Sequence, residues 1–279
     1  MAEASYLKVV VVIGAGGMGL AIARRLGSGR RLLLADYSPI VLERALTTLQ
    51  NEGYVATSHE VDISSYSAVV DMVQAVSKFG QIDAIIHTAG VGPGASNTKQ
   101  VFEINLLGTA NIIDAFLPVA SPGTSLVCIA SMAGSMLPSL SPELEKHLAT
   151  APLDQLLQHE RIVLEGEGAH PGIAYPLAKR GNQLRVQAAA RAWGAKGARV
   201  NSVSPGIIAT GLGHAQLDGP SGEMMRGMIE RSAARRMGTP DDIANAVAWL
   251  CERESNFISG TDILVDGGAA AGRKWHAET

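Results

Sequence analysis

The chain has 279 residues, of which 47% are hydrophobic and 18% are charged, and its formal net charge is −3. This length and composition predict one globular α/β domain over residues 1–279. The small net charge gives no electrostatic reason to expect nucleic acid or an anionic membrane as a partner. Cys128 and Cys251 lie far apart in apolar segments, which indicates buried thiols in a reducing compartment rather than a disulfide or a metal site. We therefore expect a cytoplasmic protein that binds no metal.

A glycine-rich turn follows the first predicted strand. That strand (KVVVVI) has the β-branched character of a central parallel strand that is buried on both faces. Glycines at the first, third and sixth positions of the turn satisfy G-x-G-x-x-G and let the backbone approach a pyrophosphate, which the N-terminus of the next helix holds. An ordinary glycine-rich βα turn is the alternative, and the strand–turn–helix context disfavours it. The predicted cofactor-binding residues of this turn are Gly14, Gly16, Gly17, Met18 and Gly19.

Acidic residues follow the next two predicted strands. The second strand ends at Asp36, 22 residues after Gly14, which is the position of the acidic residue that binds the adenosine ribose in NAD-binding folds. A turn or helix N-cap aspartate is the alternative reading of Asp36. The third strand is followed by Asp62 and Ile63. Asp62 is expected to cap the adenine, to cap the next helix, or to do both.

Strands continue to alternate with helices along the rest of the chain. A fourth strand opens into the small residues Ala89 and Gly90, a fifth ends at Ser131, and two more strands follow. The tail from residue 269 is expected to lie on the surface. This alternation predicts a doubly wound parallel sheet, a Rossmann fold of about seven strands with helices on both faces.

Tyr175 and Lys179 are four residues apart and therefore share one face of a helix. An ammonium near a phenol favours the ionised phenol and lowers its pKa from about 10, so the pair can transfer a proton. The spacing alone often arises by chance, as a half-buried ring beside a solvated amine. The glycine turn and the polar strand ends upstream indicate instead the catalytic centre of a dinucleotide-dependent oxidoreductase.

The order of these motifs resembles that of the short-chain dehydrogenases/reductases over nearly the whole chain. The resemblance rests on the glycine turn, Val61-Asp62, His87-Thr88-Ala89-Gly90, Asn105, Ser131, Tyr175-x-x-x-Lys179, Asn201-Ser202-Val203-Ser204-Pro205-Gly206 and Asp266-Gly267-Gly268. The turn is one residue shorter than is usual in the family and has Ile13 in place of a threonine. His87 replaces the usual asparagine and is expected to be a structural hydrogen-bonding residue rather than a catalytic base.

The distance between Ser131 and Tyr175 is unusual for this family. The two are 44 residues apart, which is similar to a minority branch typified by bacterial 3α-hydroxysteroid dehydrogenase/carbonyl reductase. The inserted residues, from about 134 to 172, are expected to form a mostly helical lid over the substrate side of the nicotinamide pocket. Ser141-Pro142-Glu143 is a good helix start, and Pro152 is expected to restart a second helix. A surface excursion or an oligomer contact is the alternative.

The family's chemistry implies hydride transfer between a nicotinamide and a carbonyl or carbinol carbon. Tyr175 would be the general acid in reduction and the general base in oxidation, and Lys179 would lower its pKa and bind the nicotinamide ribose. Ser131 would hold the substrate oxygen, and Asn105 would position a water in a proton path. A strand-end turn serine and a helix asparagine bonded to nearby backbone are the alternatives. The resemblance adds to the expected cofactor contacts, which together are Gly14, Gly16, Gly17, Met18, Gly19, Asp36, Asp62, Ile63, Ala89, Gly90, Tyr175, Lys179, Pro205, Gly206, Ile208 and Thr210.

The sequence thus predicts an NAD-dependent oxidoreductase that acts on a secondary alcohol or ketone, largely apolar and steroid-like or another hydrophobic carbonyl. NAD is expected rather than NADP, because Asp36 would repel a 2′-phosphate. An NADPH-dependent 3-oxoacyl reductase and a non-catalytic NAD-sensing Rossmann module are the alternatives. The resemblance also implies a homo-dimer or homo-tetramer.

Overall fold

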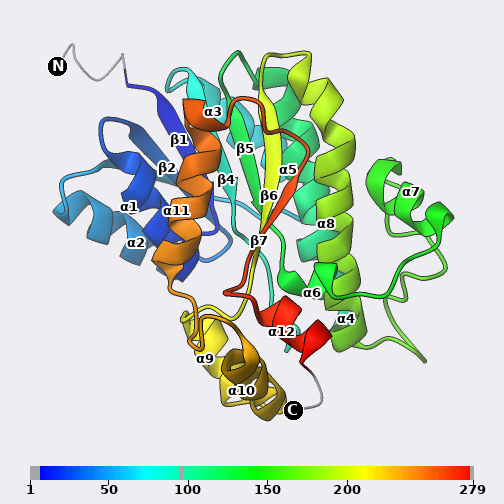
Figure 1. The fold of residues 1–279 in the computed structure, drawn as a ribbon. Helices are drawn as coiled ribbons and strands as arrows, with labels where there is room; N and C mark the ends of the chain where they lie inside the picture. The colour runs from blue at the N-terminus through cyan, green and yellow to red at the C-terminus, as the bar shows by residue number, and fades with distance from the viewer. Residues whose placement is uncertain (1–6, 95–96, 277–279) are drawn as a thin grey trace.

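The computed structural model describes residues 7–94 and 97–276. Its centre is one sheet with the strand order β3-β2-β1-β4-β5-β6-β7 (Figure 1). Every pairing between neighbouring strands is parallel. The strands are β1 (Val9–Ile13), β2 (Arg31–Asp36), β3 (Val55–Glu60), β4 (Ile82–His87), β5 (Ser125–Ile129), β6 (Arg199–Pro205) and β7 (Asp262–Val265). This order confirms the expected doubly wound Rossmann fold, in which ligands bind where the strand order reverses, between β1 and β4.

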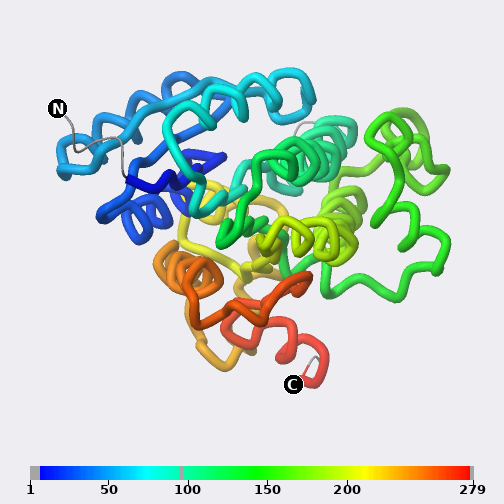
Figure 2. Tube along the Cα trace, turned by 90° about the horizontal axis from the view of Figure 1, so that it is seen from above, coloured from blue at the N-terminus to red at the C-terminus, as the bar shows by residue number. Residues whose placement is uncertain are grey.

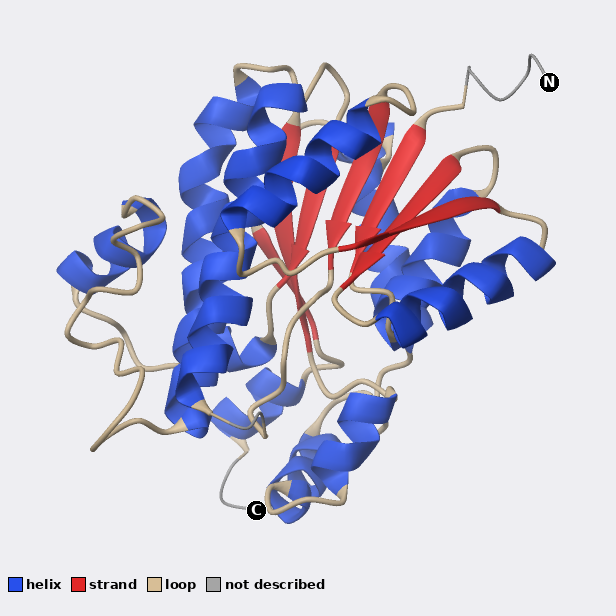
Figure 3. Ribbon diagram, turned by 180° about the vertical axis from the view of Figure 1, so that it is seen from behind, coloured by secondary structure: helices blue, strands red, loops and turns tan. Residues whose placement is uncertain are grey.

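Helices cover both faces of the sheet (Figures 1 and 3). One face carries α1 (Gly17–Gly27), α2 (Pro39–Asn51) and α11 (Pro240–Cys251), and the other carries α3 (Tyr66–Ser77), α5 (Gly108–Phe116) and α8 (Pro171–Gly194). Every residue of β1 is buried, and its side chains alternate between the two layers. The continuous apolar strands are therefore explained by burial on both sides.

A long helical run carries Asn105 along the sheet. It consists of α4 (Thr98–Gln100), a π-helical stretch (Val101–Leu107) and α5. Within it the N–H of Gly108 donates to the carbonyl of Glu103, five residues earlier, and such π-bulges occur frequently at functional sites. The run 98–119 is long and apolar enough to cross a membrane by composition, but 67% of the tested window is buried inside the structure, as in a core helix.

Short helices gather beyond the carboxyl ends of the strands (Figure 1). They are α6 (Met132–Ser135), α9 (Gly211–Leu217), α10 (Gly222–Arg231) and α12 (Ala269–Trp275). The tail from Ala269 was expected on the surface, but α12 packs on α10 and buries both Ala269 and Gly272. The helix nevertheless lies on the surface, since residues 273–276 are exposed, and residues 277–279 lie outside the described part of the chain.

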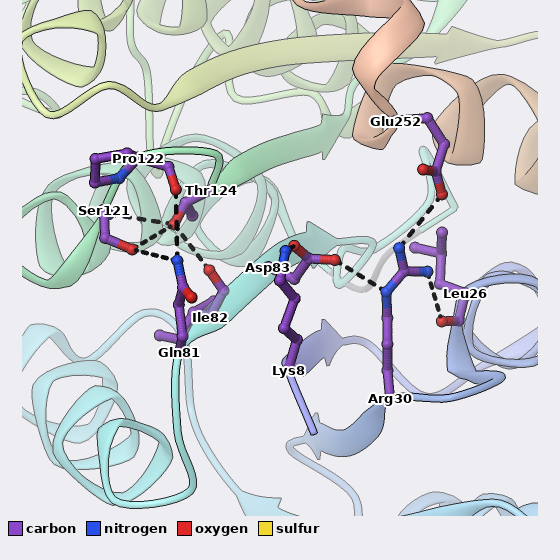
Figure 4. Close-up of polar contacts among 10 residues, drawn as sticks. All are labelled: Lys8, Leu26, Arg30, Gln81, Ile82, Asp83, Ser121, Pro122, Thr124 and Glu252. Carbon is purple, nitrogen blue, oxygen red and sulfur yellow. Dashed lines mark hydrogen bonds and ion pairs between the residues drawn. The ribbon is translucent and has the colours of Figure 1, made fainter. Parts of the chain in front are cut away.

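At the amino ends of the strands, ion pairs hold the sheet together (Figure 4). Asp83 of β4 pairs with Lys8 at 2.7 Å and with Arg30 at 2.9 Å, and Arg30 also reaches Glu252 at 3.4 Å. Partly exposed pairs of this kind contribute little stability each, but together they join the starts of β1, β2 and β4 to the end of α11. Ligand chemistry is therefore sought at the opposite, carboxyl edge.

The segment between Ser131 and Tyr175 differs from the expected mostly helical lid. The helix expected at Ser141 is present as α7 (Pro142–Thr150), with the Ser141 hydroxyl accepting from the N–H of Leu144. The second helix, expected at Pro152, is absent, and residues 151–170 form turns and loops. The proline ends α7, since the residue before a proline prefers an extended backbone.

The chain after α7 folds back onto it instead of forming a new helix. The His147 Nε2 lies 3.0 Å from the carbonyl oxygen of Leu156. Leu156 is fully buried in a cluster with Leu144 and Leu148 of α7. Burial of this leucine against α7 thus replaces the amphipathic second helix that the sequence pattern indicated.

The position of α7 also differs from that of a lid. Its leucines pack against the π-helical stretch and against α8, with Phe102 and Leu184 in the same cluster. Figures 2 and 3 show α7 at the side of the molecule, next to α8, while the loops on either side of α7 extend toward the carboxyl edge in Figure 3. A salt bridge between Arg180 of α8 and Glu145 of α7, at 2.8 Å, also joins the two helices.

Candidate functional site

A cavity of about 500 Å³ opens at the carboxyl edge of the sheet, between the ends of the central strands and the short helices α6, α9, α10 and α12. It brings together many residues that the sequence singled out from distant parts of the chain. Those that line it are Met18, Gly90, Ser131, Tyr175, Lys179, Pro205, Gly206, Ile208 and Thr210. The cavity therefore lies where a doubly wound sheet binds its ligand.

The glycine turn fits tightly against the end of β4. Gly14 has φ of +97°, and a Cβ there would lie 2.5 Å from the backbone nitrogen of Ala89. A Cβ at Gly19 would lie 1.8 Å from the carbonyl oxygen of Gly14. The Thr88 hydroxyl donates to that same carbonyl at 2.8 Å. Both positions thus require glycine, one for its backbone conformation and one for close approach.

The N-terminus of α1 is open to a ligand. Gly16 is the N-cap, so no side chain accepts from the first N–H groups of the helix. The first turn of α1 also contains no acidic residue. Gly16 and Gly17 are exposed, and a Cβ on Gly16 would meet no atom within 4 Å. Backbone N–H groups at a helix N-terminus form a binding site for a pyrophosphate. The residues present therefore fit the pyrophosphate of a dinucleotide cofactor.

The carboxylate of Asp36 lies beside the glycine turn. Its Oδ2 accepts from the N–H of Ala15 at 2.8 Å, and its Oδ1 accepts from the N–H of Ser38 at 2.9 Å. The N-cap of α2 is Ser38, whose hydroxyl accepts from Val41. The helix-cap alternative for Asp36 is therefore wrong, and each half-buried oxygen keeps a lone pair for a ribose hydroxyl.

Asp62 and Ile63 form a small turn after β3. The Oδ1 of Asp62 accepts from both the N–H and the hydroxyl of Ser64, at 2.9 and 2.7 Å. Since Ser65 caps α3, the helix-cap alternative for Asp62 is wrong as well. Sequence reasoning missed Asn111, whose amide donates to the Ile63 carbonyl at 2.8 Å and fixes this turn. The signal for it was a polar amide next to the apolar residues Ile112 and Ile113.

The loop after β6 meets the glycine turn across the cavity. The N–H of Gly206 donates to Val265 at 3.0 Å, which ties the end of β6 to β7. Thr210 caps α9 through its hydroxyl, which accepts from Gly213 at 3.1 Å. The Cγ2 of Thr210 would lie 3.2 Å from a Cβ on Gly17. The loop is therefore placed to cover a cofactor that lies on the turn.

The catalytic candidates Ser131, Tyr175 and Lys179 share the centre of the cavity. Ser131 is delivered by the end of β5 and caps α6, with its hydroxyl accepting from Ala133 at 3.2 Å. The same hydroxyl lies close enough to the Tyr175 phenol to lower its pKa. The Lys179 Nζ lies 5.9 Å from the centre of the Tyr175 ring and donates to the carbonyl of Ile129 at 3.0 Å. A carbonyl oxygen between Ser131 and Tyr175 would meet two hydroxyl donors.

Burial controls the protonation of the tyrosine and the lysine. It raises the pKa of Tyr175 above its usual value, while the hydrogen bond with Ser131 acts in the opposite direction. Burial also lowers the pKa of Lys179 to about 8. The pKa of Tyr175 thus shifts opposite to the expectation from its spacing to Lys179, because desolvation is the larger effect and the ammonium is not among the groups that shift it. A neutral phenol at pH 7 is suited to donate a proton.

The side chain of Asn105 is bonded to backbone rather than directed into the cavity. Its amide nitrogen donates to the Val91 carbonyl and its Oδ1 accepts from the Val91 N–H, both at 2.9 Å. Asn105 is fully buried, and a Cβ on Gly90 would lie 2.8 Å from its Oδ1 and 3.5 Å from the Lys179 Nζ. Asn105 thus holds the cavity wall next to the lysine.

His87 acts as a buried neutral hydrogen-bond donor. Its Nε2 lies 3.0 Å from the Thr109 hydroxyl, which donates to the carbonyl of Asn105 at 2.8 Å. Since that hydroxyl has one proton to give, the His87 Nε2 is the donor toward it. Burial lowers the pKa of His87 to about 3. This geometry supports a structural role, and Thr109 is a partner that sequence reasoning missed.

Residues 7–94 and 97–276 contain no group of three or more histidine, cysteine or acidic side chains that could hold an ion. Both cysteines are free; Cys128 is buried, and burial raises the pKa of its thiol to about 12.

The substrate side of the cavity has walls that sequence reasoning did not identify. Of the inserted segment, only Met136, Leu137, Pro138 and Gly172 line it, and the remainder packs elsewhere. The other walls come from methionines of α6 and α10, and from Arg273 of α12. No motif signalled these residues, because their positions depend on how the short helices pack.

Replacing a leucine of α7 tests whether the inserted segment is a lid over the substrate or only packs beside α8. Leu148 is fully buried in the cluster beside α8 and does not line the cavity. Leu148→Ala is expected to lower the free energy of unfolding by about 2–5 kcal/mol and to leave KM unchanged. Denaturant unfolding and steady-state kinetics measure the two quantities. Leu137→Ala, at the cavity wall, is the matched variant, and its KM is expected to rise. A raised KM in the Leu148 variant would instead support the lid hypothesis.

Comparison with known proteins finds relatives over almost the whole chain. A family model described as short chain dehydrogenase matches residues 8–141, and one described as enoyl-(acyl carrier protein) reductase matches residues 162–270. A short-chain dehydrogenase/reductase of Alternaria brassicicola is 36% identical over 267 residues, which cover 94% of this chain and 95% of the relative. The meso-2,3-butanediol dehydrogenase of Serratia marcescens is 31% identical over 268 residues, which cover 95% of each.

Solved structures share the fold. Levodione reductase aligns with a TM-score of 0.75 and 24% identity, covering 95% of this chain and 98% of that one. A variant of the actinorhodin polyketide ketoreductase, solved with NADPH, aligns with a TM-score of 0.74 and 23% identity over the same shares. At these identities the likeness concerns the fold alone.

Proposed function

Because the chain belongs to the short-chain dehydrogenase/reductase family, an oxidoreductase family that acts on alcohol and ketone groups, we propose that it interconverts a largely apolar secondary alcohol and its ketone with NAD. The observation that carries the proposal is the placement of Ser131, Tyr175 and Lys179 around one apolar cavity. The nicotinamide, when bound, supplies or accepts the hydride.

In the reductive direction, the substrate carbonyl oxygen accepts hydrogen bonds from Ser131 and Tyr175. The Tyr175 phenol then gives its proton to that oxygen as negative charge develops there. Lys179 is held on the Ile129 carbonyl at 3.0 Å, and its charge stabilises the phenolate that remains. In oxidation the same groups work in reverse, and the phenolate takes the proton of the alcohol.

We propose that a water beside Asn105 returns the proton from Lys179 to solvent. The proximity of the Asn105 Oδ1 and the Lys179 Nζ to Gly90 supports this path. The amide itself is occupied by Val91, so the Asn105 contribution is to hold the wall that the water would touch.

NAD is expected to be preferred over NADP. The Asp36 carboxylate lies at the glycine turn, where it can accept from the ribose hydroxyls, and a 2′-phosphate would place like charges together. At a separation of 4 Å and an effective dielectric near 20, that repulsion is about 4 kcal/mol per charge pair before screening. Tyr37 and Ser38 follow, so no arginine directly after Asp36 offsets it.

The ratio of kcat/KM for the two cofactors measures this preference. Asp36→Asn keeps an acceptor for the N–H of Ala15 but removes the charge, and it should reduce the ratio by at least about tenfold. Asp71→Asn is the control, since that exposed carboxylate lies on α3 and is not among the expected cofactor contacts. An NADP preference in the wild type, or an unchanged ratio in Asp36→Asn, would contradict the assignment.

An apolar substrate is supported by the walls of the cavity. Buried Met132, Ile207, Met225 and Met228 form one cluster at its edge, and methionine adapts to irregular apolar shapes. A panel of alcohols and ketones that includes steroids and small diols, assayed by nicotinamide absorbance with each cofactor, tests the proposal. Turnover confined to small polar polyols would contradict it.

The panel also decides between the alternatives. A preference for 3-oxoacyl thioesters with NADPH would indicate a 3-oxoacyl reductase, which the charge of Asp36 disfavours. NAD binding without turnover of any member would indicate a non-catalytic NAD-sensing module, which the intact catalytic set disfavours.

We also propose a branch of the family, an oligomeric state and a cellular location. The 44 residues between Ser131 and Tyr175 support the branch with a long insertion typified by bacterial 3α-hydroxysteroid dehydrogenase/carbonyl reductase. A homo-dimer or homo-tetramer is also proposed. In each protomer α7 packs on α8, so part of the α8 surface is not open to a partner. A cytoplasmic location is supported by the two free thiols.

A further inference from the structure

The cavity carries positive charge at its rim. Among the described residues that line it, the charged side chains are Lys179 at the reaction centre and Arg273 of α12, and none is acidic. The other lining side chains are mainly apolar or small. A neutral hydrophobic substrate would have no charged group for this guanidinium to bind.

Arg273 is not engaged in an ion pair within the described part of the chain. Its Nη1 contacts the sulfur of Met136 at 3.9 Å, and the side chain is exposed. Other arginines of the fold, such as Arg180 and Arg236, pair with carboxylates at 2.7–2.8 Å. A planar guanidinium has five donors and matches a carboxylate or phosphate bidentately. Arg273 therefore keeps its anion-binding capacity free for a ligand.

The backbone that carries Arg273 is fixed in place. The Asp266 carboxylate accepts from the N–H groups of Gly268 at 2.9 Å and Ala270 at 2.8 Å, which holds the start of α12. At Gly272, a Cβ would lie 2.3 Å from the carbonyl oxygen of Arg231, so α12 packs closely on α10. The guanidinium is thus held at the cavity by a helix that packs closely on its neighbour.

We infer that the substrate carries an anionic group, a carboxylate or phosphate, separated by an apolar body from the alcohol or ketone that reacts, and that Arg273 binds this group. The inference rests on the proposed function and deepens it by adding a charge to the substrate class. Met136 links the two ends of the site, since it contacts Arg273 and lies five residues after Ser131.

The test uses methyl-ketone carboxylic acids of increasing length, from 4-oxopentanoate to 10-oxoundecanoate, each paired with its neutral methyl ester. The wild type should show a kcat/KM at least about tenfold higher for the acid than for the ester at the length that spans the site. Arg273→Gln should reduce this ratio to near one through KM, and Arg273→Glu should invert it. Lys274→Gln removes the neighbouring cation, which does not line the cavity, and should leave the ratio unchanged.

A binding measurement separates this inference from the proposed function. Calorimetry on the Tyr175→Phe protein saturated with NADH compares the affinity of each acid with that of its ester without requiring turnover. An acid preference that Arg273→Gln removes supports the inference even if no ketone is turned over by the wild type. Equal affinities for acid and ester at every length, or an acid preference that survives in Arg273→Gln, would overturn it.

Discussion

The Tyr175→Phe protein is expected to lose turnover by about 10²- to 10⁴-fold, the usual contribution of a positioned acid–base group. Its affinity for NAD should remain close to that of the wild type, because the phenol acts on the substrate oxygen. The substitution removes one oxygen from a partly buried ring that lies beside Ser131. Steady-state kinetics and cofactor titration by fluorescence measure the two effects separately.

Lys179→Ala is the comparison that tests the division of roles. Lys179 is 5% exposed and donates to the Ile129 carbonyl at the cavity wall. Its loss should reduce both turnover and NAD affinity, since it serves the phenol and the cofactor ribose. A Tyr175→Phe protein that kept more than a few per cent of wild-type turnover would show that another group moves the proton.

The sequence predicted those parts of the site that depend on local patterns. The glycine turn, Asp36 and Ser131 follow buried strands, and a parallel sheet brings the carboxyl ends of its strands to one edge. Their approximate positions therefore followed from the order of the elements. Tyr175 and Lys179 were likewise placed together by helical periodicity.

The parts that depend on packing between distant elements were not predictable in this way. Pro152 has the signals of a helix start, but burial of Leu156 against α7 is more favourable in the folded chain. The direction of the Tyr175 pKa shift depends on the depth of the cavity, which no spacing reveals. Arg273 lies in a tail without a motif, and only the packing of α12 on α10 brings it to the cavity.

The glycine turn offers a second test with a large expected effect. A Cβ at Gly19 would lie 1.8 Å from the carbonyl oxygen of Gly14, so Gly19→Ala must displace the turn from α1. Overpacking of this kind typically costs about 1–3 kcal/mol. We expect Gly19→Ala to lose both stability, measured by urea unfolding, and NAD affinity, measured by calorimetry.

Gly16→Ala should separate cofactor binding from folding. Gly16 has φ of −72° and ψ of −165°, which L-residues adopt readily, and a Cβ there meets no protein atom within 4 Å. The free energy of unfolding should therefore change little, because the gain of about 0.4–1 kcal/mol from a less flexible unfolded chain is opposed by the weaker preference for alanine than for glycine at an N-cap. NAD affinity should nevertheless fall by about tenfold or more, because the new methyl group occupies the space before the N-terminus of α1 where the pyrophosphate would lie. A Gly16→Ala protein that bound NAD as tightly as the wild type would show that the phosphates lie elsewhere.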